Sequence, residues 1–218
     1  MGEGLRAQNK REMRERISDA ATALFLESGF DAVRVADVAA AARVAEKTVY
    51  NYFPTKESLV LENEERMTEA LIAQMGSTPE TSPIDVVTNV IVGEIDVLFC
   101  RWGSSDRDDR RIARFVEMLN ASPALGAAQR EMLDRLTTVT RALLAARVGA
   151  SLDDPEAHIA AIALIGLWTV ANNSLRIQLS MRSAAGPARE AVVSDTLRAA
   201  SLLQSGLASF MTRTKPSL

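Results

Sequence analysis

The sequence predicts an all-α fold, and three observations support this prediction. Apolar residues recur at intervals of three and four through most of the 218 residues, which is the spacing of one face of a helix. No segment alternates apolar and polar residues for long enough to suggest a strand. Proline and glycine lie between the periodic stretches, where helices end.

Four helices are predicted in the N-terminal third of the chain. Gly29 follows the first apolar stripe and is typical of a helix C-terminus. Pro54 ends the third helix because the residue before a proline avoids helical geometry. Thr55 is expected to cap the fourth helix. The predicted ranges are about 10–28, 35–42, 46–53 and 56–75.

Four or five longer helices are predicted after the stretch 76–83 (GSTPETSP), which indicates a boundary. Prolines stand at or near the first turn of four of these helices, where proline is tolerated. The predicted helices span about 83–102, 106–120, 123–149, 154–182 and 187–213. We therefore expect a flexible N-terminal arm, a domain of short helices, a connecting helix with its loop, and a C-terminal domain. Their predicted ranges are 1–9, 10–56, 57–82 and 83–218.

Composition excludes several classes of protein. A hydrophobic fraction of 47% with 24% charged residues is ordinary for a globular chain and argues against disorder. The start of the chain lacks the apolar segment of a signal peptide, and no apolar run reaches the roughly 20 residues of a membrane span. A cytoplasmic location without a membrane partner is therefore expected. The single cysteine excludes an intramolecular disulfide and a thiolate cluster for zinc.

Net charge alone does not indicate the partner. The whole chain has a charge of −3, and residues 1–56 hold nine Lys and Arg against eight Asp and Glu. A small basic face is sufficient for DNA binding when its contacts are well placed, because phosphate contacts act locally in salt.

The segment 30–57 has the pattern of a helix-turn-helix, with two short helices joined by a three-residue turn. Val49 and Phe53 are four residues apart and are expected to anchor the second helix on the core. Polar side chains then remain on its opposite face, as a helix in the major groove requires. These side chains are Lys47, Thr48, Asn51 and Tyr52. For an isolated polar face, a solvated surface is the competing interpretation.

Individual side chains on this helix suit different parts of a duplex. Lys47 is expected to donate to guanine or to a phosphate, and Asn51 to contact adenine or the backbone. The hydroxyls of Thr48, Tyr50 and Tyr52 suit phosphates. Lys56 opens the next predicted helix, where free N–H groups favour an anion.

This segment resembles the TetR family of regulators over about residues 10–60. The resemblance rests on Gly29-Phe30, Asp37-Val38-Ala39, Val44 and the run TVYNYFPTKE from Thr48 to Glu57. It implies backbone contacts for Thr48, Tyr50, Tyr52 and Lys56, and positions near base edges for Glu46, Lys47 and Asn51. It also implies an N-terminal helix-turn-helix unit of three helices, followed by an α-helical bundle for ligand binding and dimerisation.

Three positions depart from the family pattern. Arg43 stands where the turn usually has glycine, so we expect a positive φ there at an energetic cost. Ala45 replaces the usual Ser or Thr cap of the recognition helix, which costs about 1 kcal/mol. Arg34 replaces the usual Thr cap of the preceding helix, and we expect it to contact a phosphate.

The C-terminal half is similar to regulators associated with mycofactocin, through RIARFVEMLNASPAL at Arg111–Leu125. This similarity implies a small hydrophobic or acyl-CoA-like effector. Aromatic and polar side chains of the bundle are candidates for its pocket, with plain core packing as the alternative. The amide of Asn172 interrupts an apolar helix and needs a partner, which is a ligand, a second subunit or a nearby backbone group. The pocket candidates are Phe99, Trp102, Phe115, Leu119, Trp168 and Asn172.

No cofactor, metal or catalytic residue is expected. His158 is the single histidine, and no metal ligands are grouped around it in sequence. No P-loop, GxSxG, HExxH or dinucleotide motif is present. Small residues on the last two long helices allow close packing, either between two subunits or inside one, and the two are compatible. The family resemblance implies a homodimer through these helices. We expect a repressor that a small-molecule effector releases from a palindromic operator in double-stranded DNA. An enzyme and a protein-binding helical adaptor are the rival functions.

Overall fold

The computed structural model describes residues 2–77, 81–102, 106–181 and 185–206. Within these ranges every regular element is a helix, which confirms the predicted all-α fold. Contacts between residues divide the chain into two units, and each is described separately. The first contains residues up to 62 together with 114–129, and the second contains 63–113 and the residues from 130 onward.

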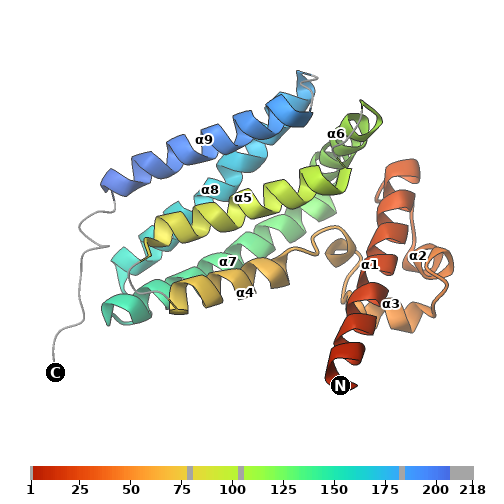
Figure 1. The fold of residues 1–218 in the computed structure, drawn as a ribbon, viewed down its shortest axis with the longest axis horizontal. Coiled ribbons are helices and arrows are strands. Elements are labelled where there is room, and N and C mark those ends of the chain that lie inside the picture. Colours follow the sequence, from red (N-terminus) through yellow and green to blue (C-terminus); the bar gives the residue numbers. More distant parts are fainter. Residues whose placement is uncertain (1, 78–80, 103–105, 182–184, 207–218) are drawn as a thin grey trace. The chain divides into compact units, whose positions relative to one another are not determined.

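The first unit is built from three helices and a short 3-10 turn around one hydrophobic core (Figure 1). The helices are α1 (Gly2–Ser28), α2 (Val35–Ala41) and α3 (Glu46–Tyr52), and the turn is η1 (Glu57–Leu59). Phe25 and Phe30 lie in the middle of this core, with ring centroids 5.2 Å apart. Leu125 joins the same core, although it lies far along the chain. The buried core residues are Ile17, Ala21, Phe25, Phe30, Val33, Val35, Val38, Ala39, Ala42, Val49, Phe53, Leu59 and Leu125.

Helix α1 begins earlier than the sequence analysis expected. Residues 2–9, predicted as a flexible arm, continue the helix without interruption. Residues 5–16 are almost all strong helix formers, which explains the extension in physical terms. A side-chain hydrogen bond one turn long supports it, because Gln8 Nε2 donates to Glu12 Oε1 at 3.0 Å.

The prediction of a single helix over 56–75 is wrong. The chain forms η1, leaves helical geometry after Leu59, and starts α4 at Glu64, which ends at Ser77. Leu59 is buried in the core of the first unit, whereas Met67 is buried in the second. A continuous helix does not bury Leu59 in the first unit and Met67 in the second. The turn is fixed locally, since Ser58 N donates to Thr55 Oγ1 and Ser58 Oγ donates to Thr55 O.

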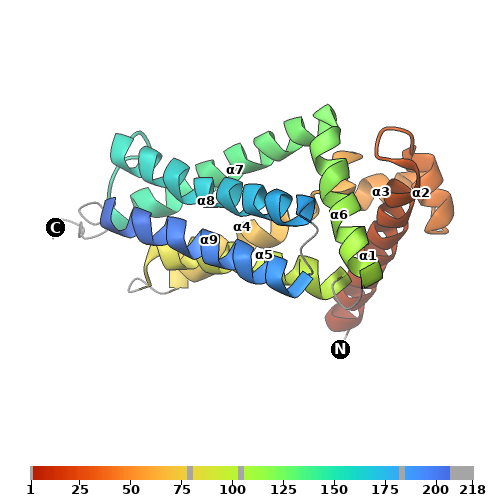
Figure 2. The ribbon, with the colours of Figure 1, turned by 90° about the horizontal axis from the view of Figure 1, so that it is seen from above.

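The second unit is a bundle of long helices (Figures 1 and 2). Within it α9 packs along α8 and α5, and α4 packs on α5. The predicted ends of the long helices agree with the structure to within two residues, apart from the end of the last one, which lies outside the described residues. The helices are α5 (Pro83–Trp102), α6 (Asp106–Ala121), α7 (Pro123–Val148), α8 (Pro155–Ser180) and α9 (Ala185–Gly206).

The units do not divide at the predicted boundary of 76–83. They divide after Glu62 and again within α6 and α7, so that residues 114–129 belong with the N-terminal helices. Helix α8 is long and apolar enough to cross a membrane by length and composition, yet half of its most apolar window is buried inside the unit. That burial is typical of the core helix of a bundle.

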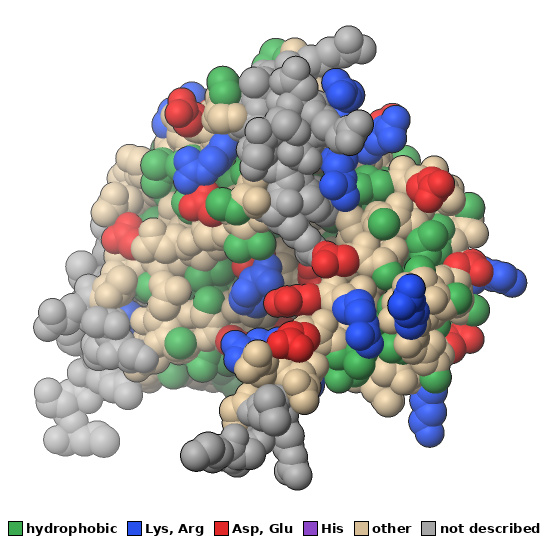
Figure 3. Space-filling model, turned by 45° about the vertical axis from the view of Figure 1, so that its right-hand side comes forward, with side chains coloured by type: hydrophobic (Ala, Val, Ile, Leu, Met, Phe, Trp, Pro, Cys, Tyr) green, Lys and Arg blue, Asp and Glu red, His purple; other side chains and the backbone are tan. Residues whose placement is uncertain are grey.

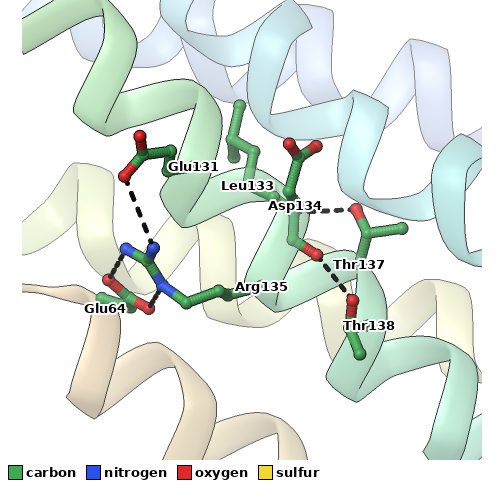
Figure 4. A network of polar contacts seen from close by, with 7 residues as sticks. All are labelled: Glu64, Glu131, Leu133, Asp134, Arg135, Thr137 and Thr138. Atoms are coloured by element: carbon green, nitrogen blue, oxygen red, sulfur yellow. Dashed lines mark hydrogen bonds and ion pairs between the residues drawn. The ribbon is translucent and has the colours of Figure 1, made fainter.

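Ion pairs at the surface tie the helices of the second unit together. Arg135 of α7 donates to both carboxylate oxygens of Glu64 in α4, at 2.6 and 2.8 Å (Figure 4). This hydrogen bonding raises the pKa of Arg135. Arg66 makes the same bidentate contact with Glu94 of α5, at 2.8 and 2.6 Å. The two arginines are exposed and the two glutamates are half-buried, so these pairs orient α4 more than they stabilise the fold.

Candidate nucleic-acid interface

Helix α3 has one buried face and one exposed face. Val49 is fully buried and Phe53, which follows the helix, is 1% exposed. Glu46, Lys47 and Asn51 are exposed, and the side chain of Tyr50 is 46% exposed. The helix is therefore held from behind by apolar contacts, and its polar side chains face solvent.

Three of the eight predicted contact residues are half-buried, namely Thr48, Tyr52 and Lys56. Tyr52 packs against the core of the first unit. Tyr50 takes the outward position on the last turn instead. Contact of any of these residues with DNA remains a prediction.

The turn before α3 has the geometry of a Schellman motif, which normally requires glycine. Val44 N donates to Ala39 O at 2.9 Å, and Arg43 N donates to Ala40 O at 3.1 Å. Arg43 has a φ of 56°, in the left-handed region, which confirms the expected positive φ. At the start of α3, Ala45 makes no side-chain capping bond, so the N–H groups of the first turn lack that partner.

Arg34, predicted to contact a phosphate, is held by Asp37 at the start of α2. Asp37 Oδ2 accepts the backbone N–H of Arg34 at 2.9 Å, and Asp37 Oδ1 accepts Nη2 at 2.9 Å. This hydrogen bonding lowers the pKa of Asp37 and raises that of Arg34. The carboxylate therefore offsets part of the positive charge that Arg34 offers to a phosphate.

Lys56 is half-buried and links two loops of the first unit. Its Nζ lies 4.3 Å from the centroid of the Phe30 ring and 3.5 Å from the carbonyl oxygen of Asp31. A cation over an aromatic face is attracted by the ring quadrupole. Lys56 thus has a structural role in addition to the predicted contact with DNA.

Sequence reasoning missed Arg14, which fixes the C-terminal end of α3 from α1. Its Nη1 donates to Tyr52 O at 3.2 Å, and its Cζ lies 4.7 Å from the centroid of the Phe53 ring. A cation is favourable at the C-terminal end of a helix. The two residues are 38 positions apart, so local spacing gave no signal for the contact.

The junction of α6 and α7 was also missed as part of this unit. Ser122 is buried and its Oγ donates to Asp31 Oδ1 at 3.2 Å. Leu125 is 1% exposed, and Leu119 packs against the same core. Pro123 indicated a helix start at this point in the sequence, but it gave no information about the partner.

The predicted effector-pocket residues fall in both units. Phe99 and Trp168 are buried and Asn172 is half-buried, all in the second unit. Phe115 and Leu119 belong to the part of α6 in the first unit. The side chain of Trp102 lies outside the described residues. A described groove instead runs along α9, lined by Arg189, Glu190, Val193, Ser194, Leu197, Arg198 and Ser201.

Some buried polar atoms of the second unit have no hydrogen-bond partner among the described residues. They include Thr88 Oγ1 in α5, Thr140 Oγ1 in α7 and Trp168 Nε1 in α8. An unpaired buried donor or acceptor is unfavourable, and the described residues leave each of these atoms unsatisfied. Over the described ranges, no group of three or more His, Cys, Asp or Glu is placed to hold a metal ion.

On the face drawn in Figure 3, positive charge is not concentrated in one place. The described Lys and Arg side chains of this face are interspersed with Asp and Glu. A nucleic-acid contact here depends on a few well-placed cations rather than on a broad basic surface.

Comparison with known proteins identifies the first unit. Residues 17–62 match the family model described as "Bacterial regulatory proteins, tetR family". The chain is similar to the HTH-type transcriptional repressor KstR of Rhodococcus jostii (strain RHA1), with 35% identity over 81 residues. That match covers 37% of this chain and 38% of KstR, so it spans well under half of either protein.

Solved structures share the fold over most of the chain at low identity. SmeT, in its complex with triclosan, has a TM-score of 0.56 and 17% identity, covering 89% of this chain and 91% of SmeT. A TetR-family regulator from Syntrophomonas wolfei str. Goettingen has a TM-score of 0.54 and 18% identity, covering 88% of this chain and 96% of that regulator. NalD of Pseudomonas aeruginosa is the secondary repressor of the MexAB-OprM pump. It has a TM-score of 0.51 and 20% identity, covering 87% of this chain and 97% of NalD. Residues 17–62 of the first unit, which contain the helix-turn-helix, therefore match the tetR family of bacterial regulatory proteins.

Proposed function

We propose that this protein is a homodimeric transcriptional repressor that binds a palindromic operator through α3 and leaves it when a small-molecule effector binds the second unit. One observation carries the proposal: Val49 and Phe53 pin α3 to the core while Lys47, Tyr50 and Asn51 face solvent. The repressor named KstR, which is similar over 81 residues, supports repression as the sign of regulation.

The exposed side chains of α3 share one side of the helix. Tyr50 and Asn51 follow Lys47 by three and four residues, which places them within about 60° of it around the axis. Lys47 contacts guanine or a phosphate, Asn51 contacts adenine, and the hydroxyl of Tyr50 donates to a phosphate. In a dimer, two such helices enter major grooves roughly 34–36 Å apart.

Helices α8 and α9 supply the dimer face in this proposal. Exposed apolar side chains form a stripe along α8 at helical spacing: Ile159, Ile162, Val170 and Ile177. Gly166 lies in the same stripe, and a Cβ placed on it meets no atom within 4 Å. Leu197 and Leu202 of α9 are also exposed. Covering these side chains with a second copy removes apolar surface from water.

The effector in this proposal is a small hydrophobic or acyl-CoA-like molecule bound in the second unit. The buried atoms Thr88 Oγ1, Thr140 Oγ1 and Trp168 Nε1, which have no described partner, support a ligand with polar groups. A ligand shifts an equilibrium only through its different affinities for two states. Effector and operator must therefore weaken each other's binding by the same factor.

A DNA-binding titration tests the proposal. We expect the protein to bind the intergenic DNA upstream of its own coding sequence, and Lys47→Ala to change which operator variant is preferred. Arg130→Ala removes an equally exposed cation from α7 and is expected to leave binding unchanged. Upstream DNA that stays unbound at low salt with excess protein would point to an enzyme or an adaptor. Operator affinity that is unchanged by a saturating effector would contradict the inducible part.

A further inference from the structure

The first three turns of α1 extend beyond the core of the first unit. Gly4 and all residues from Ala7 to Glu12 are exposed, and Met13 is the first residue of α1 that packs against the core. The segment is nevertheless helical from Gly2. It is therefore a stiff projection whose surface has no partner among the described residues.

Arg14 ties this projection to the recognition helix. It bonds Tyr52 O and lies over the Phe53 ring, at the C-terminal end of α3. Lys10 and Arg11 precede Arg14 by four and three residues, so they lie within about 60° of it around α1. With a rise of about 1.5 Å per residue, they begin only about 5–6 Å further along the axis. The acidic Glu12 points to the other side of α1, where Gln8 bonds it.

Lys10 and Arg11 are exposed and have no hydrogen bond or ion pair within the described ranges. Unpaired cations beside a helix that enters the major groove meet the phosphates that border that groove. The projection is a helix about 10–12 Å wide, and the minor groove is about 6 Å wide. The helix therefore meets the phosphates without reaching base edges in the minor groove.

We propose that Lys10 and Arg11 form a second contact surface for DNA, which binds backbone phosphates of the duplex next to the bases that α3 reads. The inference rests on the proposed function, because it requires α3 to bind duplex DNA. It assigns to α1 a share of affinity that does not depend on the sequence. It also explains why α1 continues as a helix far beyond the length that the core needs.

The test compares the salt dependence of operator binding for the wild type and for K10A/R11A, by fluorescence anisotropy. Alanine favours helix, so the projection keeps its shape, which far-UV circular dichroism checks. Each lost phosphate contact lowers the slope of log K against log salt by about 0.9, so we expect a decrease of nearly two. At 0.1 M salt this corresponds to a loss of affinity of up to about 60-fold. The ranking of operator variants is expected to stay the same.

Arg16→Ala is the matched control. Arg16 is exposed on the same helix, but it lies about 160° from Arg14 around the axis. We expect the Arg16→Ala variant to have the wild-type slope of log K against log salt. A wild-type slope for K10A/R11A, or an equal decrease for R16A, would overturn the inference and leave the proposed function standing. A changed ranking of operators would show base contact and would also overturn it. A wild-type protein that binds no duplex would overturn both.

Discussion

Replacing Arg43 with glycine tests whether the turn before the recognition helix is strained. Arg43 holds a φ of 56° in the turn that joins α2 to α3, and an L-residue in this region costs roughly 1–2 kcal/mol. Glycine avoids that cost, but its greater freedom in the unfolded chain takes back about 0.4–1 kcal/mol. We therefore expect Arg43→Gly to raise the free energy of unfolding of the first unit by roughly 1 kcal/mol.

The assay is urea denaturation followed by far-UV circular dichroism, with native-state hydrogen exchange at the amides of α2 and α3 to isolate the first unit. Arg43→Ala is the control, since alanine keeps the strained geometry while removing the same exposed side chain. Its stability should match the wild type. A glycine variant no more stable than the alanine variant would refute the strain argument.

Three further outcomes follow from named contacts. Arg14→Ala should lower the protection of α3 amides against exchange by roughly 1–2 kcal/mol, because a hydrogen bond to Tyr52 O and a cation–π contact are lost; unchanged protection would contradict this. Gly166→Trp should abolish the dimer in sedimentation. Gly93→Trp should not, although Gly93 is exposed and, like Gly166, has open space around it; a dimeric Gly166→Trp protein would rule out the α8 face. Arg34 lowers the pKa of Asp37, so the stability from this pair is complete above the usual value of 3.8 and lost as pH falls through the lower folded value. Asp37→Asn should remove that acid sensitivity from the urea midpoint, and an identical pH profile would refute the assignment.

Local patterns in the sequence predicted the helices and the unusual turn. Periodic apolar residues predict helix faces wherever packing follows the same period. The positive φ at Arg43 was predicted because the resembling family usually has glycine at that position of the turn. The break after Leu59 could not be predicted in this way. It arises because neighbouring residues are buried in two different units, and helical spacing is the same on both sides of the break.

Contacts between distant segments could not be predicted from the sequence either. Arg14 meets α3 across 38 residues, and Ser122 meets Asp31 across 91. No spacing rule links such positions. The outward face of α3 was largely predicted, because Val49 and Phe53 fix its orientation. The exchange of Tyr50 for Tyr52 on that face arises from packing of Tyr52 against the core.

A cleavage experiment tests most directly whether α3 lies in the groove of an operator. Lys47→Cys in a Cys100→Ser background allows an iron chelate to be attached at the exposed face of α3, because Cys100 is the single cysteine. With the chelate at position 47, the account predicts two clusters of backbone cuts, separated by about one helical turn of DNA, 10–10.5 base pairs, or a multiple of it. Uncut DNA in a complex that still forms, or the same cuts from a chelate at Arg130→Cys, would contradict it.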